Sequence, residues 1–107
     1  MKSTASENRK GTLHEAEQLN VAYSVSGEHK AEIVFVNHSG AARNVYWLDY
    51  TGKRVLYNKL PSGQTYALIF EKGGYTYLTH PWLITDEYDN ALAIYYPDTK
   101  KRTVILE

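Results

Sequence analysis

Hydrophobic and polar residues alternate with a period of two along most of this chain. In the first such segment Val21, Tyr23 and Val25 alternate with small or hydroxylated residues, which is the pattern of a half-buried strand. Clusters rich in Gly, Pro, Asn and Asp separate the later segments. The expected strands span residues 21–26, 31–37, 45–50, 54–60, 65–71, 75–78, 82–85, 91–96 and 103–106. Strands spaced about ten residues apart predict an all-β protein, a single antiparallel β-sandwich of about seven to eight strands.

The N-terminal part of the chain has a different pattern. Residues 1–11 are rich in Ser, Lys, Glu and Asn, and we expect a mobile tail there. Thr12 followed by Glu15 fits a capping box, which predicts a short helix over residues 13–18. The expected organisation is therefore a polar tail with a possible short helix over residues 1–18, followed by the β-sandwich domain over residues 19–107.

Composition narrows the range of partners. The 12 basic and 12 acidic side chains give a formal net charge of zero, so we expect neither nucleic acid nor an anionic membrane as partner. The chain has no cysteine, which excludes a disulfide framework and a thiolate metal site. Residues 1–10 lack the apolar run of a signal peptide, and no apolar run is long enough to cross a bilayer. We therefore expect a cytoplasmic protein.

The sequence offers no catalytic set and no cofactor signature. Lys72-Gly73-Gly74 lacks the features of a phosphate-binding loop. The histidines are scattered without metal-ligand spacing, at positions 14, 29, 38 and 80. The acidic turn formed by Asp86, Glu87 and Asp89 could bind calcium weakly, although a solvated turn is the commoner explanation. We expect a protein that is not an enzyme and that needs neither metal nor cofactor.

Polar and aromatic residues in the C-terminal half are the strongest candidates for a site. The 10 Tyr outnumber Trp and Phe together, and Tyr is common both in strands and on partner surfaces. Pro81 interrupts its strand, and the neighbouring His80 is then easily directed into a pocket. By pattern alone, however, His80 could equally be a satisfied surface or core histidine, and Trp47 and Trp82 could be core residues.

Several segments, taken together and in order, resemble the β-domain of the von Hippel–Lindau tumour suppressor. They are Phe35-Val36-Asn37-His38-Ser39, Trp47-Leu48-Asp49-Tyr50-Thr51-Gly52, Tyr57, Leu60-Pro61 and His80-Pro81-Trp82. In that family five of the matching positions line a pocket for 4-hydroxyproline. The resemblance implies that Trp47, Tyr57 and Trp82 are walls, with the Tyr57 hydroxyl meeting the peptide backbone, and that Thr76 and His80 bond the hydroxyl. Thr76 is placed by counting back from His80 and stands where the human member has serine.

The resemblance implies a module that binds a prolyl-hydroxylated peptide or protein. The helical domain that binds Elongin C in the animal protein has no counterpart here, so we expect no Elongin C partner. Two alternatives remain open at this point. One is a generic interaction domain that pairs with an unmodified strand and has no hydroxyproline selectivity. The other is a structural or accessory β-sandwich whose tryptophans are simply core.

Overall fold

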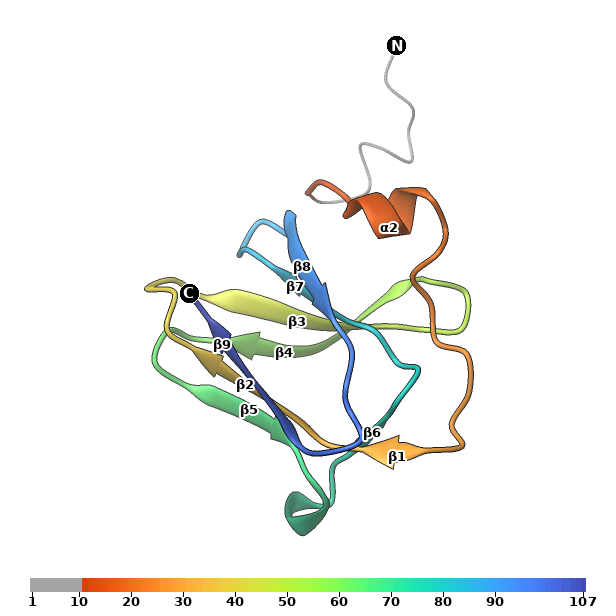
Figure 1. Cartoon of the computed structure of the whole chain (residues 1–107). Helices are drawn as coiled ribbons and strands as arrows, with labels where there is room; N and C mark the ends of the chain where they lie inside the picture. The colour runs from red at the N-terminus through yellow and green to blue at the C-terminus, as the bar shows by residue number, and fades with distance from the viewer. Residues whose placement is uncertain (1–10) are drawn as a thin grey trace.

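A computed structural model describes residues 11–107 of the chain (Figure 1). The described part contains nine strands in three sheets, one four-residue α-helix and one short 3-10 turn, which confirms the all-β fold. The predicted tail over residues 1–11 lies outside the described residues except for its last position. Within the described range, no helix has the length and apolar character needed to span a membrane.

The larger sheet has four strands in the order β4-β3-β7-β8. They are β3 (Arg43–Leu48), β4 (Arg54–Leu60), β7 (Trp82–Thr85) and β8 (Ala91–Tyr95), and every neighbouring pair is antiparallel. The bounds of β4 and β7 coincide with the predicted strands. All four residues of β7 are buried, because this central strand has packed side chains on both of its faces.

The second sheet has the order β5-β2-β9, formed by β2 (Ile33–Asn37), β5 (Thr65–Leu68) and β9 (Arg102–Leu106). The pair β2–β9 is parallel, so the expectation of a purely antiparallel sandwich is wrong for this pair. The chain reaches β9 from β8 in the other sheet, and a crossover, unlike a hairpin, does not impose an antiparallel direction. A two-residue ladder joins β1 (Lys30–Ala31) to β6 (Thr76–Tyr77).

The main core fills the space between the two larger sheets. The period-two pattern of β2 places Ile33 and Phe35 on its inner face, and both are fully buried. The other members are Val45, Leu60, Leu68, Trp82, Ile84, Val104 and Leu106. A smaller cluster on the opposite face of the four-stranded sheet contains Ala22, Leu48 and Leu83. The N-terminal segment contributes to this smaller cluster through Ala22 and through Ala16, which packs against it.

The predicted strand over residues 21–26 is extended but belongs to no sheet. Its alternation is present with the small residues inward: Ala22 and Ser24 are 3% and 2% exposed, whereas Val21 and Val25 are 63% and 66% exposed. The segment runs closely over the β3–β4 hairpin, where the Ala22 carbonyl oxygen approaches Gly52. Only small side chains fit beneath a backbone at such short range, so the large apolar side chains face outward.

The short helix is present as α2 (Glu15–Gln18), but its predicted cap is wrong. His14 Nδ1 accepts a hydrogen bond from the Ala16 N–H, and the Glu17 carboxylate accepts from the His14 N–H. Thr12 is unavailable as a cap because its backbone bonds to the turn before β8 and to the first residue of β8. Its N–H donates to Asn90 Oδ1 and its carbonyl accepts from the Ala91 N–H.

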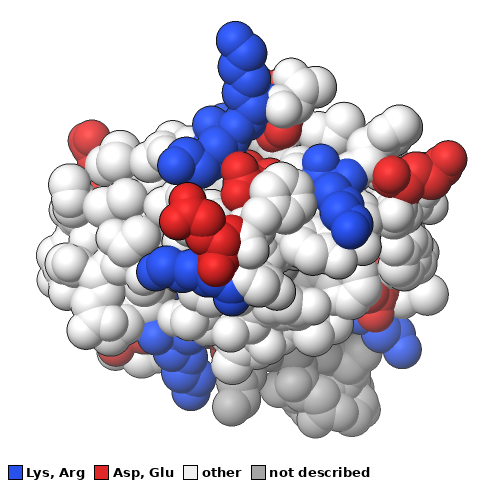
Figure 2. All heavy atoms as spheres, turned by 90° about the horizontal axis from the view of Figure 1, so that it is seen from below, with Lys and Arg blue, Asp and Glu red and all other residues white. Residues whose placement is uncertain are grey.

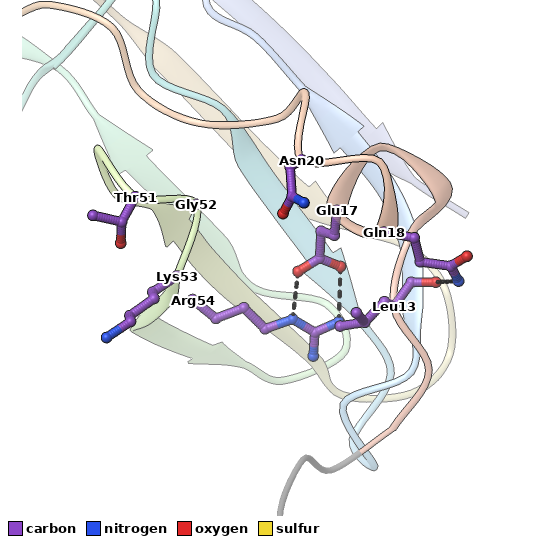
Figure 3. A pocket seen from close by; sticks show the side chains of 8 residues that line it. All are labelled: Leu13, Glu17, Gln18, Asn20, Thr51, Gly52, Lys53 and Arg54. Atoms are coloured by element: carbon purple, nitrogen blue, oxygen red, sulfur yellow. Dashed lines mark hydrogen bonds and ion pairs between the residues drawn. The ribbon is translucent and has the colours of Figure 1, made fainter. Parts of the chain in front are cut away.

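An ion pair ties α2 to the larger sheet (Figure 3). Arg54 Nε and Nη2 donate to the two carboxylate oxygens of Glu17 over 2.9 and 3.0 Å. The remaining donors of Arg54 reach the carbonyls of Asp89 and Thr12. One guanidinium therefore joins the helix, the start of the described chain and the turn before β8.

The predicted strand over residues 65–71 ends early. The 3-10 turn η1 (Phe70–Lys72) follows β5, and Gly73 in the left-handed region at φ 73° closes it. The Glu32 carboxylate accepts the Phe70 N–H over 2.7 Å and so holds the start of the turn. Phe70 is 51% exposed as a result, instead of lying in the inward row of a strand.

Candidate functional site

All the sequence-predicted site residues line one pocket of about 240 Å³. Trp47 comes from β3, Tyr57 from β4, Thr76 from β6, His80 from the loop before β7, and Trp82 from β7 itself. Tyr75 and Tyr77 complete the lining. Residues from separate parts of the chain therefore meet here, where strands β3, β4 and β7 of the larger sheet lie beside β6 and the loop that connects β6 to β7.

Two other pockets are larger, but their linings are of a different kind. One of about 530 Å³ lies between α2 and the β3–β4 hairpin and contains the Arg54–Glu17 pair (Figure 3). Another of about 640 Å³ lies beside Tyr46 and Asp89. In both, the buried charged groups already have partners within the protein. Volume alone therefore does not select the site, and the aromatic pocket is the one with converging rings and polar atoms.

The two tryptophans lie directly opposite each other on neighbouring strands. Opposite residues in an antiparallel pair point to the same face, so both indoles reach the pocket. Trp82 is only 2% exposed and also belongs to the main core. Trp47 is half-buried, and its Nε1–H donates to Ser24 Oγ over 2.8 Å, while Ser24 Oγ donates to the Leu48 carbonyl over 2.7 Å. The orientation of Trp47 thus depends on the N-terminal segment.

Tyr57 owes its position to a bulge in β4. The register with β3 passes from Val45–Asn58 to Tyr46–Leu56 and leaves Tyr57 without a direct partner. Bulges redirect side chains next to sites in many sheets. The Tyr57 ring packs edge-on against both indoles, with centroids 6.2 Å from Trp47 and 5.0 Å from Trp82. It is 47% exposed and so stands at the mouth of the pocket.

Thr76 is 2% exposed and supplies a hydroxyl inside the pocket. Its Oγ1 accepts the Trp82 Nε1–H over 3.0 Å. A hydroxyl can accept and donate at the same time. No acceptor for the Thr76 hydroxyl hydrogen occurs among residues 11–107, so this group is free to donate to a ligand.

His80 is 7% exposed and is enclosed by other rings. The centroids of Trp47 and Tyr77 lie 5.3 and 5.0 Å from its own. Its Nε2 lies 3.0 Å from the Tyr50 hydroxyl. Burial lowers the pKa of His80 below its usual value, and a hydrogen bond with the Ser26 backbone opposes part of that shift. The imidazole is therefore neutral at neutral pH.

Four further residues, which the sequence pattern did not indicate as site residues, shape this site. Tyr75 and Tyr77 flank Thr76 and line the pocket, and Tyr50 and Ser24 hold His80 and Trp47. Tyr75 also packs against the exposed Phe70, with ring centroids 5.5 Å apart. The abundance of Tyr was a general signal for such a surface, but no local pattern distinguishes these tyrosines from the others.

No Asp, Glu, Lys or Arg is among the residues that line the aromatic pocket, and Lys30 Nζ lies 4.7 Å from the ring centroid of the lining residue Tyr75. On the face of the molecule seen in Figure 2, basic and acidic side chains are interspersed among large uncharged areas. The carboxylates of the acidic turn bond within and beside the turn: Asp86 accepts from the N–H groups of Tyr88 and Asn90, and Asp89 accepts from Asn44 and Tyr46. Residues 11–107 contain no cluster of three or more potential metal ligands.

Comparison with known proteins gives a family for the chain. No curated protein sequence matches it significantly. The family described as the VHL beta domain matches residues 22–96, which is most of the chain and includes every predicted pocket residue as well as Ser24 and Tyr50. The chain therefore belongs to the VHL β-domain family, whose domains recognise protein substrates.

Proposed function

We propose that this domain binds 4-hydroxyproline within a prolyl-hydroxylated peptide or protein, and that its activity is binding without chemistry. The observation that carries the proposal is the convergence of Trp47, Tyr57, Thr76, His80 and Trp82 on one pocket. Its volume of about 240 Å³ is below the roughly 300–1,000 Å³ typical of sites for drug-sized ligands. A pocket of this size suits a single small ring.

The aromatic residues fit the apolar faces of a pyrrolidine ring. The Tyr57 ring is nearly perpendicular to both indoles, at 74° to Trp47 and 89° to Trp82, so the three rings form adjacent walls. Both indole N–H groups are bonded inside the protein, and the walls are therefore fixed before a ligand arrives. Rigid aromatic walls lose little conformational entropy on binding.

The polar residues fit the hydroxyl corner of the same ligand. Thr76 can donate its free hydrogen to the ligand oxygen. The ligand hydroxyl can in turn donate to a nitrogen of the neutral His80 ring. A site that bonds a ligand hydroxyl discriminates against the analogue that lacks it, because buried polar groups then lose a partner.

One observation favours the alternative of a generic interaction domain. Strand β4 is an edge strand, and Val55, Leu56 and Tyr57 are 36%, 44% and 47% exposed along it. An exposed apolar edge can accept an added strand from an unmodified peptide. The pocket and the edge meet at Tyr57, so the same experiment separates the two functions.

Isothermal titration with peptides that differ only in proline or 4-hydroxyproline tests the proposal. Wild-type protein is expected to prefer the hydroxylated peptide. Tyr57→Ala should weaken the binding of both peptides, because the ring contacts either pyrrolidine, whereas Thr76→Val should reduce the preference, because it removes the hydroxyl that donates to the ligand. Trp82→Ala is unsuitable, since Trp82 is part of the core and such truncations cost about 3–5 kcal/mol of stability. Equal wild-type affinity for the two peptides would reject a preference of the wild-type protein for hydroxyproline.

A further inference from the structure

Tyr50 contacts His80 from outside the pocket lining. Its hydroxyl lies 3.0 Å from His80 Nε2. Its ring is perpendicular to those of His80 and Trp47, at 89° and 84°, with centroid distances of 5.5 and 5.8 Å. Tyr50 is nevertheless 50% exposed, because it follows the end of β3 where the hairpin turns. Tyr50 therefore joins the buried imidazole to a residue that is itself partly in solvent.

The Tyr50 contact means that His80 needs no ligand to satisfy Nε2. A neutral imidazole has one accepting nitrogen, and a phenol can donate to it. Among residues 11–107 no buried side-chain nitrogen or oxygen lacks a hydrogen-bond partner, so the aromatic pocket has no unsatisfied polar group of this kind. A proline ring entering the pocket would leave the Tyr50–His80 bond in place.

We infer that Tyr50 sets the selectivity of the pocket: its hydroxyl takes the place of a ligand hydroxyl at His80 and thereby lowers the cost of binding unhydroxylated proline, so that the wild-type preference for 4-hydroxyproline rests on Thr76. This inference rests on the proposed function and extends its ligand class. When hydroxyproline binds, its hydroxyl replaces that of Tyr50 at Nε2. Because Tyr50 is 50% exposed as a residue, its released hydroxyl can then bond to water, and the exchange is close to neutral in free energy.

Removal of the Tyr50 hydroxyl should make the pocket discriminate more strongly against unhydroxylated proline. In Tyr50→Phe, a bound proline ring would cover Nε2 and leave a buried acceptor without a donor. A bound hydroxyproline would supply the missing donor. The variant should therefore be more selective than the wild type, chiefly through weaker binding of proline. Thr76 does not share this behaviour, because its donor hydrogen has no partner in the described chain in either protein.

The test uses two minimal probes, N-acetyl-4-hydroxyproline-N-methylamide and N-acetylproline-N-methylamide. Each is titrated into the full chain while the indole N–H signals of Trp47 and Trp82 are followed by NMR. We expect Tyr50→Phe to raise the ratio of the two affinities by about tenfold. Tyr88→Phe is the matched control, because Tyr88 is 71% exposed and lies outside the aromatic pocket. Its ratio should equal that of the wild type.

The double variant Tyr50→Phe/His80→Ala shows whether the effect passes through His80. The gain in selectivity should disappear there, which a general loosening of the hairpin would not produce. An unchanged or smaller ratio in Tyr50→Phe would overturn the inference while leaving a hydroxyproline-selective wild type intact. If the wild type binds both probes equally and Tyr50→Phe separates them, the inference is supported and the proposed wild-type preference is rejected. If neither the wild type nor Tyr50→Phe binds either probe, the inference and the proposed function are both rejected.

Discussion

The indole nitrogen of Trp82 donates a hydrogen bond to the Thr76 hydroxyl over 3.0 Å, and both residues are 2% exposed. A wall of the pocket and one of its polar groups are therefore held as a unit. The bond also directs the Thr76 oxygen so that its own hydrogen remains for a ligand. The site is thus built from the core outward, because Trp82 is a core residue as well as a pocket wall.

The Trp82–Thr76 bond predicts different results for two substitutions at position 76. Thr76→Val keeps the shape but leaves the buried Trp82 N–H without an acceptor, which should lower the free energy of unfolding by about 1–3 kcal/mol. It should also remove the donor to the ligand and reduce any hydroxyproline preference. Thr76→Ser keeps the hydroxyl and should retain that preference. Urea unfolding and paired-peptide titration measure the two effects, and equal stability of the valine and wild-type proteins would contradict the role of this bond.

His80 should make stability depend on pH. Burial lowers the pKa of His80 below the ordinary 6.5, so the unfolded state binds more protons than the folded state just below that pH. The free energy of unfolding should therefore decrease as pH falls below 6.5 towards the lowered pKa, and the His80 contribution should be constant above 6.5. Urea unfolding from about pH 7.5 to about pH 5 measures the slope.

A neutral substitution supplies the control for this pH dependence. His80→Gln should flatten the decrease in stability, because the titrating group is gone. His29→Gln alters an exposed histidine outside the pocket lining and should leave the decrease in place. A slope that is the same in His80→Gln and in the wild type would assign the pH dependence to another group.

The Arg54–Glu17 pair should be important for the stability of the N-terminal segment. Its side chains are only 14% and 5% exposed, so Arg54→Ala would leave the Glu17 carboxylate nearly buried and unpaired. Losing one partner of a buried pair costs roughly 3–5 kcal/mol. Arg54→Ala/Glu17→Ala should recover part of that loss, because no charge is then left behind. A double-mutant cycle by chemical denaturation gives the coupling, and a coupling near zero would show that the pair is not important.

Ser24 should affect ligand binding without touching the ligand. Ser24→Ala removes the acceptor of the Trp47 N–H and the donor to the Leu48 carbonyl. We expect a stability loss of about 1–3 kcal/mol and weaker binding of hydroxyproline and proline peptides to the same extent, since Trp47 contacts either ring. Ser26→Ala is the neighbouring control, because no hydrogen bond involves its side chain among residues 11–107. A loss restricted to the hydroxylated peptide would contradict a wall-positioning role for Ser24.

Most strands were predictable because their local pattern and their tertiary environment agree. β4 and β7 have the predicted bounds, and the alternation in β2 correctly places Ile33 and Phe35 inside. The errors occur where contacts distant in sequence override the local preference. Thr12 does not cap α2 because it bonds to Asn90 and Ala91.

The sequence by itself determined an all-β chain and five residue types suited to one small ring with a hydroxyl. The first conclusion depends on short-range periodicity, which a sequence states directly, whereas the five residues were singled out by the resemblance to the VHL β-domain family. Only the tertiary structure decided that the five residues meet, that a bulge brings Tyr57 to the pocket mouth, and that β9 runs parallel to β2. The tertiary structure alone also decided that the Tyr50 hydroxyl forms a hydrogen bond with His80 Nε2. These features depend on register and on the packing of distant segments, and no local pattern encodes them.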